Sequence, residues 1–390
     1  MTHLTRLIVF FLILGVFLRF EYFFDANRYI TLRLYFLLLI IYCFFSANKG
    51  SVCLGLYTTI ILTLITSLLF SFFWLDYFSD PIKDIFRTIF HFSFFMVPYL
   101  LAICIRRNAV VFDKSSVRWS IISSLCISTV EAIVRIFFPL SIIETKDSWD
   151  NSAIESGISS GLSASNFYVF KYGSFMFTDS NGLAIILVSL LGLTLLMRYR
   201  LLSLWTITLI LLCFSRSAYL GAVFTCLLYY LFFVNKSMVA KHINIMLVGM
   251  LSFFSIYWLI YSFNILEDGS LITKFEIFSH LNKVFDYPIE SVLFGFGIDK
   301  GNYIYSPGSD YYAHALIPLL LGHVGIIGVV IYLLVMFYSA FIYGFRIGMI
   351  FFIPFLIMGL SLASPWEPAP FVFMLISGLY FESVKKYKND

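Results

Sequence analysis

Arg216 is the only charged residue between positions 201 and 234, a stretch of apolar and small polar residues. A guanidinium group can bind two oxygens of one phosphate at once, and its charge does not titrate in the physiological range. An arginine kept in such surroundings is a candidate contact for an anionic substrate. The alternative is a side chain that only anchors the chain at a membrane surface, with its charged end in water.

His314 is the second residue with suitable chemistry. It follows Tyr311 and Tyr312, which we predict to contact the substrate, and precedes a long apolar run. Histidine titrates near neutral pH and can accept a proton from a hydroxyl group. His314 is therefore a candidate general base, and the alternative is an interfacial histidine that packs among aromatic side chains.

Polar residues mark two further apolar stretches. Asp179 and Asn181 stand where an apolar segment begins, and they are predicted either to cap a helix or to contact a polar substrate. Glu131 and Arg135 are four residues apart, which places them on one face of a helix and predicts a local ion pair. The sequence lacks the HExxH motif and the glycine motifs that bind nucleotides, so we expect no metal and no cofactor.

The elements that must position these residues are membrane helices. Hydrophobic residues make up 61% of the 390-residue chain and charged residues only 12%. Repeated apolar runs of spanning length predict an all-α integral membrane protein with one polytopic domain over residues 1–390. We predict about 12 transmembrane helices, near 6–23, 30–47, 52–74, 86–105, 118–140, 175–197, 201–215, 217–234, 243–264, 315–343, 347–364 and 370–382.

The charge distribution orients these helices. One set of loops, together with both termini, is basic and nearly free of acids, and the positive-inside rule assigns it to the cytoplasm. Its basic residues are Arg6, Lys49, Arg106, Arg107, Lys114, Arg118, Arg198, Arg200, Lys236, Lys241, Arg346, Lys385, Lys386 and Lys388. A single helix over 201–234 would move the later basic residues to the other face. The rule therefore favours a hairpin that turns at 213–221 and places Arg216 at the outer membrane surface.

Two long loops are expected on the outer, periplasmic face. Residues 141–174 are rich in Ser, Gly and Asn, and we predict a flexible segment there. The major loop, 265–313, separates the ninth and tenth spans. Its amphipathic stretch 271–285 is predicted to form a helix at the membrane interface.

Glycines recur on both sides of His314. Gly295 and Gly297 predict a turn late in the major loop. Three glycines in the following apolar run are spaced three residues apart and predict close helix packing: Gly322, Gly325 and Gly328. His323 lies within this run and is expected to be a packed helix residue.

In their order along the chain, these features resemble the O-antigen polymerase and O-antigen ligase superfamily. A DxN element at 179–181 opens a span, and a Ser-Arg-Ser-x-x-x-Gly hairpin follows at 215–221. A long outer loop then carries Leu-Phe-Gly-x-Gly at 293–297, and His314 precedes Gly-x-x-Gly and a long apolar helix. The resemblance covers roughly 175–343.

The resemblance implies a metal-independent glycosyltransferase of the inner membrane that uses a glycan on undecaprenyl diphosphate at the periplasmic face. Arg216 would hold the diphosphate, and His314 would orient or deprotonate the acceptor hydroxyl. Members of the family usually carry a second arginine early in the long loop. In this sequence Lys274 stands nearest that position and is the first candidate for the same role, and Lys283 is the second. Flippase and chain-length regulator proteins are further expected partners besides the lipid bilayer, and nucleic acid is not.

Three functions stay open at this point. The first is an O-antigen or capsular repeat-unit polymerase, and the second is an O-antigen ligase that transfers the glycan to lipid A core. A polysaccharide flippase or transporter is the third, but it would need polar groups along a path through the membrane midplane. Apart from Glu131 and Arg135, the polar residues gather on the predicted outer side, which favours an enzyme.

Overall fold

The computed structural model describes residues 10, 13–14, 16–17, 114–139, 170–171, 174–177, 180–234, 269–306, 313–361 and 363–389. Within these residues the chain is helical and contains no strand. The helices are α5 (Lys114–Phe137), α9 (Ser180–Leu196), α10 (Arg200–Leu212), α11 (Arg216–Tyr229) with a π-helical end (Tyr230–Val234), α13 (Gly269–Ser279) with a 3-10 extension (His280–Asp286), α14 (Ile289–Phe294), α15 (Ile298–Gly301), α16 (Leu316–Tyr343), α17 (Phe345–Gly359) and α18 (Ala369–Asn389).

Seven of these helices coincide with predicted spans, namely α5, α9, α10, α11, α16, α17 and α18. Within the described part of the chain, three segments are long and apolar enough to cross a membrane by themselves: Lys114–Phe137, Arg216–Val234 and Leu316–Phe341. The protein is therefore a helical membrane protein. The predicted spans at 30–47, 52–74, 86–105 and 243–264 lie outside the described residues, so the count of twelve stays a prediction.

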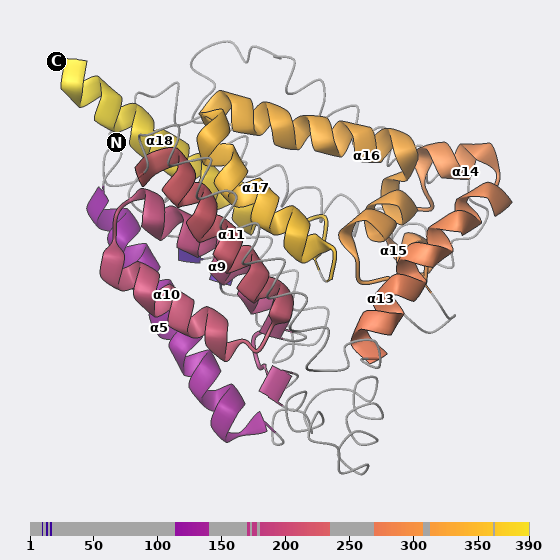
Figure 1. Ribbon diagram of the computed structural model, residues 1–390, viewed down its shortest axis with the longest axis horizontal. Coiled ribbons are helices and arrows are strands. Elements are labelled where there is room, and N and C mark those ends of the chain that lie inside the picture. The colour runs from indigo at the N-terminus through magenta and orange to yellow at the C-terminus, as the bar shows by residue number, and fades with distance from the viewer. Residues whose placement is uncertain are drawn as a thin grey trace.

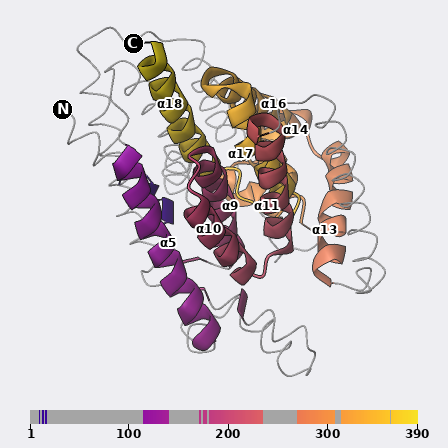
Figure 2. The ribbon, with the colours of Figure 1, turned by 60° about the vertical axis from the view of Figure 1, so that its left-hand side comes forward.

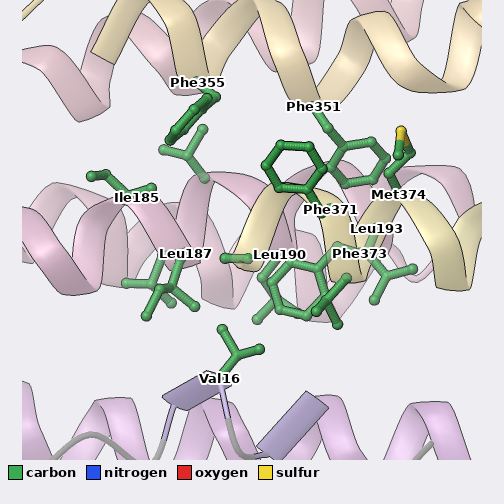
Figure 3. Packing of buried hydrophobic residues seen from close by; sticks show 14 of the residues in the cluster. Val16, Ile185, Leu187, Leu190, Leu193, Phe351, Phe355, Phe371, Phe373 and Met374 are labelled. Carbon is green, nitrogen blue, oxygen red and sulfur yellow. The ribbon is translucent and has the colours of Figure 1, made fainter. Parts of the chain in front are cut away.

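Helix α9 forms the centre of the bundle. Almost all of its residues are buried, on every side of the helix, and a helix that is apolar all round must be enclosed by other elements. It packs against α10, α11, α17 and α18. Figure 3 shows Leu190 and Leu193 of α9 beside Phe351 of α17 and Phe373 of α18.

The bundle has two chemically different ends. At one end, the Lys114 ammonium lies 5.5 Å from the ring centroid of Tyr199 and 5.6 Å from that of Tyr380. These contacts bring the start of α5, the α9–α10 turn and the C-terminal part of α18 together. The α10–α11 turn lies at the opposite end, away from the C-terminus (Figures 1 and 2).

Helix α16 is broken at Gly325, where φ is 65° and ψ is −173°. The sequence predicted one long helix over 315–343, and the structure instead divides it into two parts. A left-handed φ suits glycine because it has no β-carbon to clash with the backbone. The loop helices α13, α14 and α15 lie beside the first part of α16, to one side of the main bundle (Figure 1).

The glycine turn of the major loop docks at this break. Gly295 has φ 84° and Gly297 has φ 80°, as the predicted turn requires. The Phe296 amide donates to the Gly322 carbonyl at 2.7 Å, and the Gly297 amide donates to the His323 carbonyl at 3.2 Å. Gly322 faces Gly301 so closely that a β-carbon on either residue would overlap the other's backbone. These glycines therefore allow α16 to pack closely against the loop and its short helix α15, in line with the predicted close helix packing.

Candidate functional site: a hairpin turn beside a docked loop

The predicted hairpin at Arg216 is present, with a turn shorter than expected. Helix α10 is capped at Cys213, Phe214 adopts a left-handed φ of 53°, and α11 begins at Arg216 after Ser215. The sequence predicted a turn over 213–221, but residues 216–234 are helical. Arg216 is therefore the first residue of a helix, and its side chain is exposed.

Side chains from three helices bind the last carbonyls of α10. The Tyr219 hydroxyl of α11 donates to the Leu211 carbonyl at 2.8 Å, and the Ser180 hydroxyl of α9 donates to the Cys213 carbonyl at 2.6 Å. Between them, Arg135 Nη2 of α5 donates to the Leu212 carbonyl at 2.9 Å. A helix end leaves its final carbonyls without partners inside the helix. These bonds satisfy them and fix the turn that presents Arg216.

Arg135 is fully engaged as a structural residue. Its Nε atom lies 3.1 Å and 3.3 Å from the two carboxylate oxygens of Glu131, which confirms the predicted ion pair. Nη1 donates to the Phe170 carbonyl at 3.0 Å. Both Arg135 and Glu131 are completely buried. The pair therefore ties α5 to the hairpin turn and exposes no charge.

Arg216 differs from Arg135 in its position at a helix N-terminus. Ser215 occupies the N-cap position but makes no side-chain cap hydrogen bond, and its hydroxyl lies 3.2 Å from that of Ser217. The first amide groups of a helix carry partial positive charge and bind anions. An anion at Arg216 would meet both the guanidinium group and this helix terminus.

Gly221 explains the last position of the Ser-Arg-Ser-x-x-x-Gly sequence. A β-carbon there would lie 2.9 Å from Met358 of α17 and 3.3 Å from Val188 of α9. The glycine therefore lets α11 approach its two neighbours closely, one and a half turns after Arg216.

The end of α17 links Arg216 to the segment that carries His314. Met358 meets α11 at Gly221, and a β-carbon on the next residue, Gly359, would lie 2.8 Å from Leu316. Leu316 begins α16, two residues after His314. Arg216 and His314 thus both lie near the end of α17, at the same end of the bundle.

Helix α13 carries Lys274 toward His314. Ile277 of α13 packs in a small buried cluster with Ala313, Ala315 and Leu319. Lys274 is one helical turn before Ile277 and is partly exposed. Lys283, the second predicted lysine, approaches the Ser306 carbonyl at 3.5 Å and so lies against the loop itself.

The remaining predicted site residues divide into two groups. Asn181 is 6% exposed and lies next to Ser180, so the structure places it beside the hairpin turn. Asp179, Tyr311 and Tyr312 lie outside the described residues. Among the residues that are described, no group of three or more His, Cys, Asp or Glu side chains could hold a metal ion.

Two ionisable groups of the loop are affected by burial. Burial, with a smaller contribution from Tyr287, raises the pKa of Tyr305 to about 12, so this phenol stays protonated at neutral pH. Burial also lowers the pKa of Lys300, whose ammonium lies 5.8 Å from the ring centroid of Phe296. Neither group faces the hairpin turn in the described contacts, and we assign them to the packing of the loop.

Sequence reasoning missed the segment between α17 and α18. Trp366 and Glu367 are buried, and the Glu367 carboxylate accepts a hydrogen bond from the Ala369 amide at 3.2 Å at the start of α18. The Tyr332 hydroxyl donates to the Pro365 carbonyl at 2.7 Å. The available signal was an acidic residue between two prolines at the end of an apolar run.

Compared with known protein families and with curated proteins, the chain matches no family model and no curated protein.

Proposed function

We propose that the protein is a glycan polymerase of the inner membrane that joins lipid-linked oligosaccharide repeat units. The donor is an oligosaccharide on undecaprenyl diphosphate, and the acceptor is a hydroxyl group of another lipid-linked repeat unit at the periplasmic face. The observation that carries this proposal is the exposed Arg216, at a helix N-terminus on a turn fixed by three side chains.

The reaction needs two groups that the site can supply. The acceptor oxygen forms a bond to the anomeric carbon of the donor, and the bond from that carbon to the diphosphate oxygen breaks. The diphosphate leaves with the electron pair, and its charge is stabilised by Arg216 and by the first amides of α11. His314 takes the proton of the acceptor hydroxyl.

Lys274 is the stronger of the two lysine candidates for a second contact to the diphosphate. It belongs to the helix that packs against the His314 segment, whereas Lys283 contacts the loop's own backbone. A second cation beside Arg216 would offset the negative charges of the leaving group in place of a metal ion.

Deletion of the gene tests the proposal. Single repeat units on the lipid A core would indicate a polymerase, and long chains left on undecaprenyl diphosphate would indicate a ligase. Unchanged glycans in the deletion strain would contradict both.

Complementation then tests the residue. We expect Arg216→Ala to reproduce the deletion, with at least about a hundredfold loss of transfer, the scale of losing one contact to developing charge. Arg216→Lys should restore only part of the activity, because lysine cannot bind two oxygens in one plane. The matched control is Arg200→Ala, since Arg200 is also an exposed first residue of a helix but lies at the other end of α10. Glycan chains of normal length in the Arg216→Ala strain would contradict the proposed role of Arg216.

A further inference from the structure

His323 links the major loop to the membrane bundle. It lies in the first part of α16, is 2% exposed, and binds a residue on each side of its ring. Nε2 lies 2.7 Å from the Asn302 side-chain oxygen in the loop. Nδ1 accepts a hydrogen bond from the Trp366 indole at 3.2 Å, in the segment between α17 and α18.

The partners fix the protonation of the ring. An indole N–H can only donate, so Nδ1 must be the acceptor and carries no hydrogen. In a neutral imidazole the hydrogen is then on Nε2, and Nε2 donates to the carbonyl oxygen of the Asn302 amide. The Trp366 ring also stacks on His323, with ring centroids 6.1 Å apart and an interplanar angle of 13°. His323 is thus held in one tautomer and one orientation.

Asn302 connects His323 to the segment that carries His314. Its main-chain carbonyl accepts a hydrogen bond from the Ala313 amide at 2.8 Å. Ala313 directly precedes His314 and is itself buried against α13. The main-chain carbonyl of His323 binds the same loop through the Gly297 amide. One residue of α16 therefore fixes the loop at two points.

We propose that His323 is a positioning residue that holds the major loop on the bundle, so that His314 faces the acceptor hydroxyl. His323 acts through Asn302 and Ala313 and does not touch the reacting atoms. The catalytic part of this proposal rests on the proposed function, whereas the attachment of the loop does not.

Two substitutions at position 323 separate the two hydrogen bonds. Glutamine places its amide group near the position of Nε2, so His323→Gln can still donate to Asn302. Asparagine is shorter and reaches only the position of Nδ1. His323→Asn therefore keeps the hydrogen bond from Trp366 and loses the hydrogen bond to Asn302 in the loop. We therefore expect the loop to be held in His323→Gln and released in His323→Asn.

Limited proteolysis within 269–306, on the full-length protein in nanodiscs, measures the attachment directly. Cleavage tracks the population of the open form when opening and closing are fast. Loss of a bond between buried groups should raise that population at least about fivefold in His323→Asn, and less than about twofold in His323→Gln. Asn302→Leu removes the same bond from the loop side and should match His323→Asn, and the double variant should be no worse than either.

The transfer assay measures the catalytic consequence. In His323→Asn we expect kcat to fall by the same factor as the fraction of protein in which the loop is held on the bundle. KM for the lipid-linked donor should stay within about twofold of the wild-type value, because the donor is held by Arg216. His323→Gln should restore kcat.

Several results would overturn the proposal. Wild-type cleavage in both His323→Asn and Asn302→Leu would show that the bond does not hold the loop. Equal damage in His323→Asn and His323→Gln would show that ring packing matters and the bond does not. An unchanged kcat in a variant whose loop is released in most molecules would show that His323 does not position His314. If Arg216→Ala has no effect on glycan transfer, the proposed function fails, and the cleavage rates still decide whether His323 holds the loop.

Discussion

Arg135 and Arg216 both lie at the turn between α10 and α11, but their surroundings indicate different roles. Arg135 is completely buried, and its N–H groups donate hydrogen bonds to the Glu131 carboxylate and to two main-chain carbonyls. Arg216 is exposed and stands at a helix N-terminus. Both were recognisable in the sequence as charges among apolar residues, and only the structure separates the structural arginine from the candidate substrate contact.

If His314 is the general base of the proposed glycan transfer, a prediction follows at the residue scale. A general base must be neutral to take a proton, so the rate of glycan transfer should rise with pH through the range where histidine titrates. His314→Gln should lose about 10²- to 10⁴-fold in rate and should also lose this rise. The pH dependence of kcat/KM in reconstituted enzyme measures both effects.

The control for His314 is His280, a partly buried histidine of the same loop. His280→Gln should keep the pH dependence of the wild type. A wild-type rate in His314→Gln across neutral pH would exclude a general base at this position.

At the scale of elements, the sequence predicted local features well. The length of the apolar run and the charge bias were sufficient to predict the hairpin at Arg216, and the four-residue spacing predicted the Glu131–Arg135 pair. These features depend on helix length and helix period, which a sequence displays directly.

The partners of these elements could not be predicted in the same way. Arg135 binds Leu212, and Gly301 packs on Gly322, across long separations in the chain. The spacing of Gly322 and Gly325 indicated close packing, but a sequence pattern does not say which element approaches. The function of Asn302 depends on such a contact, so nothing in its sequence surroundings indicated it.

The hairpin turn provides a prediction at this scale. Arg135→Met should destabilise the protein by about 3–5 kcal/mol, because Glu131 would remain buried without its partner. Replacing both residues by apolar ones, Glu131→Leu with Arg135→Met, should recover part of this loss. Thermal unfolding in detergent measures the differences.

The matched control for the hairpin is Thr129→Val. Thr129 also joins α5 to α10, through a single neutral bond from the Trp205 indole at 3.0 Å. Its loss should cost about 0.6 kcal/mol, the average for such bonds between membrane helices. A cost for Arg135→Met as small as that of Thr129→Val would contradict a role in fixing the turn.

At the scale of the whole molecule, the two ends of the bundle should face different compartments. The start of α5, the α9–α10 turn and the C-terminal part of α18 lie at one end, and the hairpin turn lies at the other (Figure 1). Helix α17 provides a matched pair of test positions, since Arg346 at its start and Ser364 just after its end are both exposed.

Single cysteines at these two positions test the orientation. In a background without the six native cysteines, Ser364→Cys should react with a membrane-impermeant maleimide in intact spheroplasts. Arg346→Cys should react only after the membrane is permeabilised, because the positive-inside rule places it in the cytoplasm. Labelling of both positions in intact cells, or the reverse pattern, would contradict the predicted orientation.

The length of α10 has a consequence for the bilayer itself. The helix has 13 residues, which at about 1.5 Å per residue gives about 20 Å. A hydrocarbon core is about 30 Å thick. If Arg198 and Arg200 lie at the cytoplasmic headgroups, the hairpin turn stops about 10 Å short of the opposite ones. The other arm of the hairpin, Arg216–Val234, has 19 residues and a length of about 28 Å. The two arms therefore fit one bilayer only if α11 extends beyond the cytoplasmic surface or the bilayer thins around α10. Where the bilayer thins, the outer headgroups, and the diphosphate of a lipid among them, would lie at the level of Arg216.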